Sequence, residues 1–241
     1  MRSRNIVFNK IRNAEFVNEN YEVATYAGVG RKTLYYLLMV LVGAVGGLFV
    51  GLNNEGLYMS LLVISLIATS ICAFIGMISP RASKIAGTLY CLAEGILVGY
   101  ISATYGAIAE GAVVTALLST LAVFMVISTL FVTNIVKVGS KFKRFLITFS
   151  IGFIISQLIL YIIMTFTGQQ YNIMLCLGIS VVTVFLASLY LLMDLETIRL
   201  VVEGRYPKEY EWYASFGLAF TLVWLYVEIL RIVTILFADR N

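Results

Sequence analysis

The sequence predicts an all-α membrane protein with seven transmembrane helices. Hydrophobic residues make up 61% of the 241 residues and charged residues only 12%, whereas a soluble domain carries about 25% charged residues. Apolar runs of about 20 residues recur along the chain, which is the length that crosses the hydrocarbon of a bilayer. Because these runs are continuous and do not alternate between apolar and polar residues, they favour helices over strands.

The predicted spans follow one another with short connections. In chain order they are residues 33–52, 57–78, 85–105, 112–134, 145–166, 173–194 and 215–237. Residues 1–31 precede them as a cytoplasmic N-terminal tail, because this stretch is polar and lacks the apolar run of a cleaved signal peptide. Residues 32–241 are predicted to form one transmembrane domain. Asn53 and Asn54 suit a tight turn between the first two spans.

Basic residues mark the connections that are predicted to face the cytoplasm. They are Arg2, Arg4, Lys10, Arg12, Arg31, Lys32, Arg81 and Lys84, with further groups at 137–144 and 199–208. The intervening connections at 53–56, 106–111 and 167–172 contain none. The protein is expected in the cell membrane, that is, the plasma or inner membrane. By the positive-inside rule, its N-terminus is predicted to face the cytoplasm and its C-terminus the outside. The net charge of +4 therefore reflects topology, and no nucleic-acid partner is expected.

The connection before the last span is the longest. The stretch DLETIRLVVEG has a helical pattern, so the sixth span is expected to continue into the cytoplasm and to break at Gly204 to Pro207. Glu203, Glu209 and Glu211 are expected on a solvated face of this connection. Alternatively, they gather cations at the mouth of a pore.

Small residues indicate close helix packing in the first and third spans. Gly43, Gly47 and Gly51 are spaced by four residues, as are Gly95 and Gly99. In lipid, this spacing lets two helix backbones approach closely. Packing within the chain is favoured over oligomerisation as the explanation.

Several classes of chemistry are excluded. The chain has no histidine, which removes Ser-His and Cys-His catalysis and His-based metal sites. It has no nucleotide-binding loop of the Walker type, and its three cysteines include no CxxC pair. We therefore expect no enzymatic activity and no cofactor.

Ionisable residues inside the spans are the strongest functional signal. Glu94 lies in the middle of the third span, and Glu228 and Arg231 lie within the run TLVWLYVEILRI of the seventh; Arg81 and Asp194 lie at cytoplasmic span ends. A charge at the bilayer centre costs about 2.5–3.5 kcal/mol or more, so such residues face a bundle interior, pair with one another or line water. Glu228 and Arg231 are three residues apart, share a helix face and can form a purely structural pair.

The acids outnumber the one deep arginine, which favours a switching role. At least one of Glu94, Asp194 and Glu228 lacks a full partner and must be protonated, hydrated or shared with another carboxyl. Two neighbouring carboxyls titrate as a coupled pair, and their charge can then change within the physiological pH range. Carboxylate oxygens are also the ligands of Ca²⁺. An accessible acidic pair is therefore a candidate cation site and pH sensor.

Several stretches resemble the Bax inhibitor family, the transmembrane Bax inhibitor motif proteins. SLYLLMDLETI (188–198) and TLVWLYVEILRI (221–232) are similar to the last two helices of that family. PRASKIAGTLYCLAEGILVG (80–99) is similar to its junction of second and third helices, and ATYAGVGRKTL (24–34) to the lead-in of a bacterial branch.

The resemblance implies a fold and an activity. The last helix would be central between two three-helix layers, and the protein would be a pH-sensitive calcium leak channel. The acidic pair of the family would fall on Asp194 and Glu228, as pH sensors, ion pathway and possible Ca²⁺ ligands, and its latch arginine on Arg81. Glu94 and Arg231 form a possible network beside the pair. Arg231 departs from the family pattern, because it follows the last acid on the same face and can neutralise it.

Two rival functions remain open at this stage. In the first, the chain is a membrane regulator that binds another membrane protein, such as a membrane protease, through its tail or its lipid-facing surface. In the second, it is a proton-coupled transporter that uses Glu94 and Glu228. In every reading the partners include the lipid bilayer, and in the leak they include Ca²⁺ and protons.

Overall fold

The computed structural model describes residues 22–136, 138–168 and 172–238. The basic residues of the tail from Arg2 to Arg12 lie outside the described residues. The described chain forms seven helices and no strand beyond one isolated bridge: α2 (Tyr26–Asn53), α3 (Glu55–Ile78), α4 (Ser83–Ile108), α5 (Ala112–Val132), α6 (Ser140–Thr167), α7 (Ile173–Glu203) and α8 (Glu209–Ala238). Each is long and apolar enough to cross a membrane. The predicted fold class is confirmed.

The helix boundaries have local causes. Thr25 caps α2 by accepting a hydrogen bond from the backbone N–H of Gly28, and Asn54 alone separates α2 from α3, accepting from Leu57 N–H at 3.0 Å. Such side-chain caps satisfy donors that have no partner within the helix. The sixth helix, α7, extends to Glu203 and the chain breaks at Gly204 to Pro207, as predicted. The first helix begins at Tyr26, seven residues before the predicted span, because its cap lies at Thr25.

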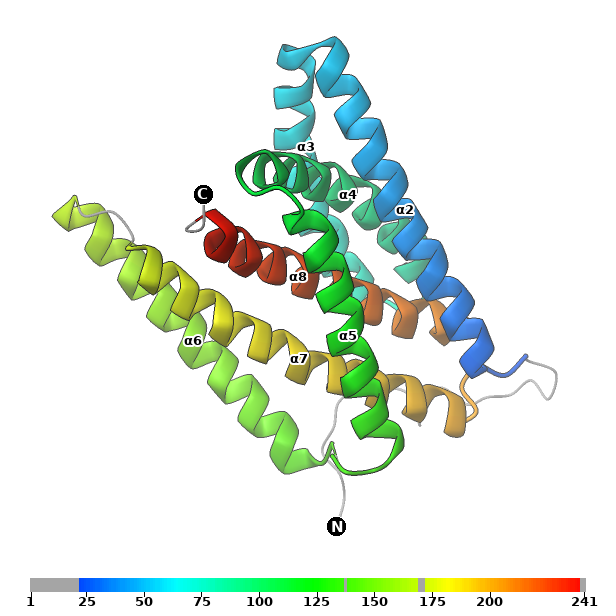
Figure 1. Ribbon diagram of the computed structural model, residues 1–241. Coiled ribbons are helices and arrows are strands. Elements are labelled where there is room, and N and C mark those ends of the chain that lie inside the picture. The colour runs from blue at the N-terminus through cyan, green and yellow to red at the C-terminus, as the bar shows by residue number, and fades with distance from the viewer. Residues whose placement is uncertain (1–21, 137, 169–171, 239–241) are drawn as a thin grey trace.

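Helix α8 lies in the middle of the bundle (Figure 1). It contacts α2, α3 and α4 on one side and α5 and α7 on the other. Half of its most apolar stretch is buried (50%), against 6% of that of α6, which contacts α7 and no other described helix. The described chain therefore has the expected central last helix between α2–α4 and α5–α7.

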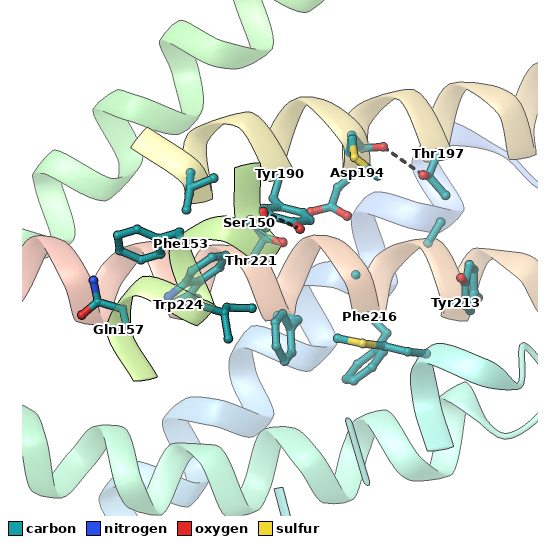
Figure 2. A pocket seen from close by; sticks show the side chains of 17 residues that line it. Ser150, Phe153, Gln157, Tyr190, Asp194, Thr197, Tyr213, Phe216, Thr221 and Trp224 are labelled. Carbon is teal, nitrogen blue, oxygen red and sulfur yellow. Dashed lines mark hydrogen bonds between the residues drawn. The ribbon is translucent and has the colours of Figure 1, made fainter. Parts of the chain in front are cut away.

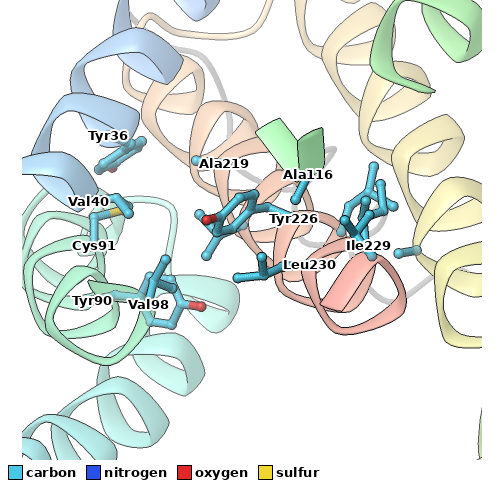
Figure 3. Packing of buried hydrophobic residues seen from close by; sticks show 14 of the residues in the cluster. Tyr36, Val40, Tyr90, Cys91, Val98, Ala116, Ala219, Tyr226, Ile229 and Leu230 are labelled. Atoms are coloured by element: carbon cyan, nitrogen blue, oxygen red, sulfur yellow. The ribbon is translucent and has the colours of Figure 1, made fainter. Parts of the chain in front are cut away.

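The core forms around α8 (Figure 3). Tyr226 and Leu230 of α8 pack with Tyr36 of α2 and with Cys91 and Val98 of α4 in one buried cluster. One polar group in this region is satisfied within the bundle: the Tyr226 hydroxyl is hydrogen-bonded to Ser102 Oγ at 2.8 Å. Inside a membrane protein, unpaired polar groups are costly, and this bond removes one such group.

Glycines set the contact between α2 and α4. A Cβ atom on Gly43 would collide with the backbone carbonyl of Leu92, and one on Gly95 with that of Val40. On Gly99 it would lie 2.9 Å from the Ala44 backbone. These glycines therefore pack α2 against α4 within one chain, as the sequence favoured, and their absent side chains allow the two backbones to touch.

Candidate functional site

A cavity of about 590 Å³ lies against α8 and is walled by α6, α7 and, at one end, α3 (Figure 2). Its lining is mostly aromatic and aliphatic. The polar lining residues are Ser150, Gln157, Tyr190, Asp194, Thr197, Tyr213 and Thr221. Asp194 is the only carboxylate among all the lining residues, which include no lysine or arginine. The cavity therefore holds one acidic group in apolar surroundings.

Asp194 points from α7 towards α8 (Figure 2). Its Oδ2 atom is inaccessible to solvent and has no hydrogen-bond partner among the described residues. A Cβ atom on Gly217 of α8 would lie 3.1 Å from its Oδ1 atom, so the glycine lets the α8 backbone approach the carboxyl. The hydroxyl of Thr221, one turn further along α8, also faces this carboxyl. An unpartnered buried carboxylate oxygen is costly in a structural role alone.

Two other hydroxyls of the cavity, those of Tyr190 and Thr197, donate hydrogen bonds elsewhere. Tyr190 donates a hydrogen bond to Ser150 Oγ at 3.0 Å, which joins α7 to α6. Thr197 donates to the backbone carbonyl of Met193 at 2.9 Å. Because these two protons are used elsewhere, they do not satisfy Asp194.

Glu228 has a partner, unlike Asp194. Its carboxylate lies 3.2 Å from Arg231 Nη1, one turn along α8, and its side chain is 10% exposed. The Arg231 side chain is 39% exposed, so the guanidinium extends from the packed interior towards the surface of the bundle. The neutralisation of Glu228 by Arg231, expected from their spacing, is present in the structure.

The structure does not bring Asp194 and Glu228 together. Asp194 lies beside Gly217 and Thr221 of α8, and Glu228 comes eleven residues after the first and seven after the second. At 1.5 Å per residue these steps correspond to about 10–17 Å along the axis. The α8 positions beside Asp194 are Gly217 and Thr221, neither of which is acidic. The predicted coupling of the two acids as neighbours therefore has no counterpart here.

Arg81 and Glu94 lie outside the cavity lining. Arg81 is exposed in the turn between α3 and α4, four residues after Met77, which lines the end of the cavity. Among the described residues no ion pair joins Arg81 to Asp194, so the predicted latch is not closed in this structure. Glu94 is half-buried on α4 beside Tyr90, whose ring lies 5.3 Å from that of Phe220 in the cavity wall.

A dedicated metal site is not formed by the described residues. No group of three or more cysteine or acidic side chains gathers within the described ranges. Ca²⁺ takes six to eight oxygen ligands when it is held stably. Asp194 and Glu228 are too far apart to share one ion, so the possible joint Ca²⁺ site has no geometric support.

Another buried acid, Glu211, lies at the start of α8. It is 1% exposed, so its predicted place on a solvated face is wrong, while Glu203 and Glu209 are exposed as expected. Its carboxylate lies 2.6 Å from Lys32 Nζ and accepts a hydrogen bond from the backbone N–H of Thr25 at 2.8 Å. The N-terminus of α2 also favours a negative charge. Glu211 therefore ties α8 to the start of α2.

Sequence reasoning missed Glu211 because nothing local relates residue 211 to residues 25 and 32. The segments meet because residues 22–25 lie along the turn at 206–208. The backbone N–H of Ala24 donates to the backbone carbonyl of Tyr206 at 2.9 Å, and the backbone N–H of Lys208 donates to the backbone carbonyl of Glu22 at 2.8 Å. Trp212, next to Glu211, lies under Lys32 and Lys84 at 4.9 and 5.4 Å from its ring centre. Two lysines from different helices thus gather over one end of α8.

Comparison with known proteins agrees with this architecture. The family model described as Bax inhibitor 1 like matches residues 5–238, nearly the whole chain. No protein with curated annotation matches the sequence. The seven membrane-crossing helices and the central α8 are consistent with the match. The chain is a multi-pass membrane protein that belongs to the Bax inhibitor 1-like family.

Proposed function

We propose that this protein is a pH-sensitive cation leak of the cell membrane, with calcium as the transported ion and Asp194 as the charged group on the ion pathway. The observation that carries the proposal is the unpartnered Oδ2 atom of Asp194 in a cavity between α6, α7 and α8. Membership of the Bax inhibitor 1-like family supports calcium as the ion. The orientation is the one that the basic connections predict, with the N-terminus in the cytoplasm.

A single carboxylate is better suited to an ion that passes through the protein than to an ion that is held there. An ion that is held by many ligands leaves slowly, and conduction requires binding that is weak enough to release the ion. Asp194 offers one negative charge and no companion acid, so a cation passing it would keep most of its water. The proposal therefore needs hydration of the cavity when the path opens.

The charge of Asp194 is free to follow pH. No basic side chain lines its cavity, whereas Arg231 fixes the charge of Glu228. The proposal consequently assigns pH sensing to Asp194, with Glu228 and Arg231 as a structural pair beside it. Arg81 is kept as the latch of a closed state, because it follows the cavity-lining end of α3 by one turn. That the protein has no enzymatic activity stays a prediction.

Ion flux across reconstituted vesicles tests the proposal. Purified protein is placed in liposomes that contain a calcium-sensitive dye, and calcium entry is followed over a series of pH values. Asp194→Asn is expected to remove most of the pH dependence, because the amide cannot change its charge. Glu228→Gln is expected to retain it, and Glu110→Gln, an exposed change between α4 and α5, serves as the control.

Two results would contradict the proposal. One is calcium entry no faster than in empty liposomes at every pH. The other is flux through Asp194→Asn with the same pH profile as the unchanged protein. Loss of pH dependence in Glu228→Gln alone would transfer the sensing role to the last helix.

A further inference from the structure

The cavity beside Asp194 has more room than an inorganic ion needs. Its volume of about 590 Å³ falls within the range of about 300–1,000 Å³ that is typical of sites for organic ligands. The open space extends from Asp194 past Tyr190 and Trp224 to Gln157 of α6. A cavity of this size can hold the body of an organic molecule as well as its charged group.

The wall of the cavity is rich in aromatic rings. Six of its lining residues carry them: Phe153, Tyr190, Tyr213, Phe216, Phe220 and Trp224. The rings of Tyr190 and Trp224 lie 5.9 Å apart, centre to centre, and are contributed by α7 and α8. Aromatic faces attract cations, and tryptophan does so best. They also provide apolar contact area for the rest of a ligand.

The charge of the cavity selects the ligand further. Asp194 supplies one negative charge, and no lining residue supplies a positive one. Its Oδ2 atom has no partner among the described residues. A ligand with a single positive charge would match this site one to one. A divalent ion would keep one charge unmatched and would find few free oxygen ligands.

We propose that this cavity binds an organic monocation, an ammonium group carried on an apolar or aromatic body. The ammonium lies against the Asp194 carboxyl where it lines the cavity, and the body packs among Tyr190, Phe220 and Trp224. This binding goes beyond the leak and does not depend on it, since it is measured without any ion flux. A bound ammonium would also occupy the position that the leak assigns to a passing cation.

Two sources can supply such a ligand. One is the headgroup of an ethanolamine or choline lipid, and the other is a free amphipathic amine. Lateral access from lipid has structural support, because α6 contacts only α7 among the described helices and makes no contact with α3 or α8. The side of the cavity between α6 and α3 is thus not closed by helix packing.

Direct binding to the purified full-length protein tests the proposal. The chain has two tryptophans, Trp212 and Trp224, so a Trp212→Phe background makes fluorescence report on the cavity alone. Protein in uncharged maltoside micelles is titrated with benzyltrimethylammonium and, separately, with its neutral isostere neopentylbenzene. We expect a saturable change with the cation, and binding about tenfold or more weaker for the neutral compound, because only the cation pairs with Asp194.

Variants and lipids sharpen the test. Asp194→Asn should weaken cation binding by about tenfold or more and leave the neutral compound unchanged. Glu110→Gln, which removes an exposed charge, should change neither. Added phosphatidylethanolamine or phosphatidylcholine should compete with the probe if lipid headgroups are the source, and phosphatidylglycerol with the same chains should not. If neither the ethanolamine nor the choline lipid competes, a free amine is the source.

The proposal is overturned if both compounds bind equally well or if the Asp194→Asn variant binds the cation unchanged. The comparison of the two compounds needs no variant at this position, so it decides the matter even if Asp194→Asn does not fold. If calcium flux depends on Asp194 but no ammonium binds, the binding proposal is wrong and the leak proposal is unaffected. Ammonium binding without flux would do the opposite.

Discussion

The guanidinium of Arg231 lies 3.2 Å from the carboxylate of Glu228, one turn earlier on the central helix α8. In this ion pair, two of the charges that the sequence places inside the membrane neutralise each other. It leaves Asp194, with its unpartnered oxygen, as the acid in the cavity. The pair and the single acid thus have different physical roles, and they can be separated by experiment.

Removing Arg231 alone should destabilise the protein. Arg231→Met leaves Glu228 buried without its partner, which costs about 1–3 kcal/mol for a group that is only partly desolvated. The double variant Glu228→Gln with Arg231→Met should recover most of this loss, because no charge is then left unpaired. Thermal unfolding in detergent measures both. A double variant no more stable than Arg231→Met would contradict a structural role for the pair.

Glu211 should be far more sensitive to substitution than its neighbour Glu209. Glu211→Ala removes the ion pair with Lys32 and the acceptor of the Thr25 backbone N–H, at a cost of about 3 kcal/mol, as for other buried pairs. Glu209→Ala, two residues away and exposed, should change stability by less than about 0.5 kcal/mol. The apparent Tm of the two variants gives the comparison. Equal values would mean that Glu211 does not hold α8 to α2.

The effect of a glycine-to-alanine substitution on stability should depend on which face of α2 the glycine occupies. A side chain on Gly43 would collide with the Leu92 carbonyl, so Gly43→Ala should separate α2 from α4 and cost about 1–3 kcal/mol. A Cβ atom on Gly46, three residues on, would meet nothing within 4 Å, so Gly46→Ala should be neutral or slightly stabilising. Unfolding temperatures measure both. A loss of stability in Gly46→Ala together with dissociation of an oligomer would instead indicate a glycine interface between chains.

An exposed ion pair outside the spans gives a prediction on pH. Lys208 donates a hydrogen bond to Glu22 and, with its charge, holds the pKa of that carboxyl below its ordinary value. The stabilisation is therefore complete above the pKa of Glu22 in the unfolded chain and is lost as pH falls through the lower pKa of the folded state. Lys208→Ala should return the pKa of Glu22 to its ordinary value, and the exposed change Lys141→Ala should not. The pKa of Glu22 is measured by NMR from the carbon resonance of its carboxyl as the pH is changed. A pKa that stays low in Lys208→Ala would show that something other than Lys208 lowers it.

The sequence by itself determined the elements of this protein. Runs of about 20 apolar residues define helices because each must satisfy its own backbone hydrogen bonds in lipid. The break at Gly204 to Pro207 and the pairing of Glu228 with Arg231 are likewise local, since they depend on turn residues and on a spacing of three within one helix. The glycines at 43 and 95 indicated close packing, though not which helices would meet.

Only the tertiary structure decided which side chains meet across helices. Asp194 lies beside Gly217 and Thr221, and Glu228 is too far along α8 to join it. The turn between α7 and α8 sets the axial offset of the two helices and therefore which residues face each other. Glu211 is buried because an extended stretch before α2 lies against that same turn. Periodicity fixes the face of a residue on its own helix, but the depth at which two helices pair depends on contacts distant in the chain.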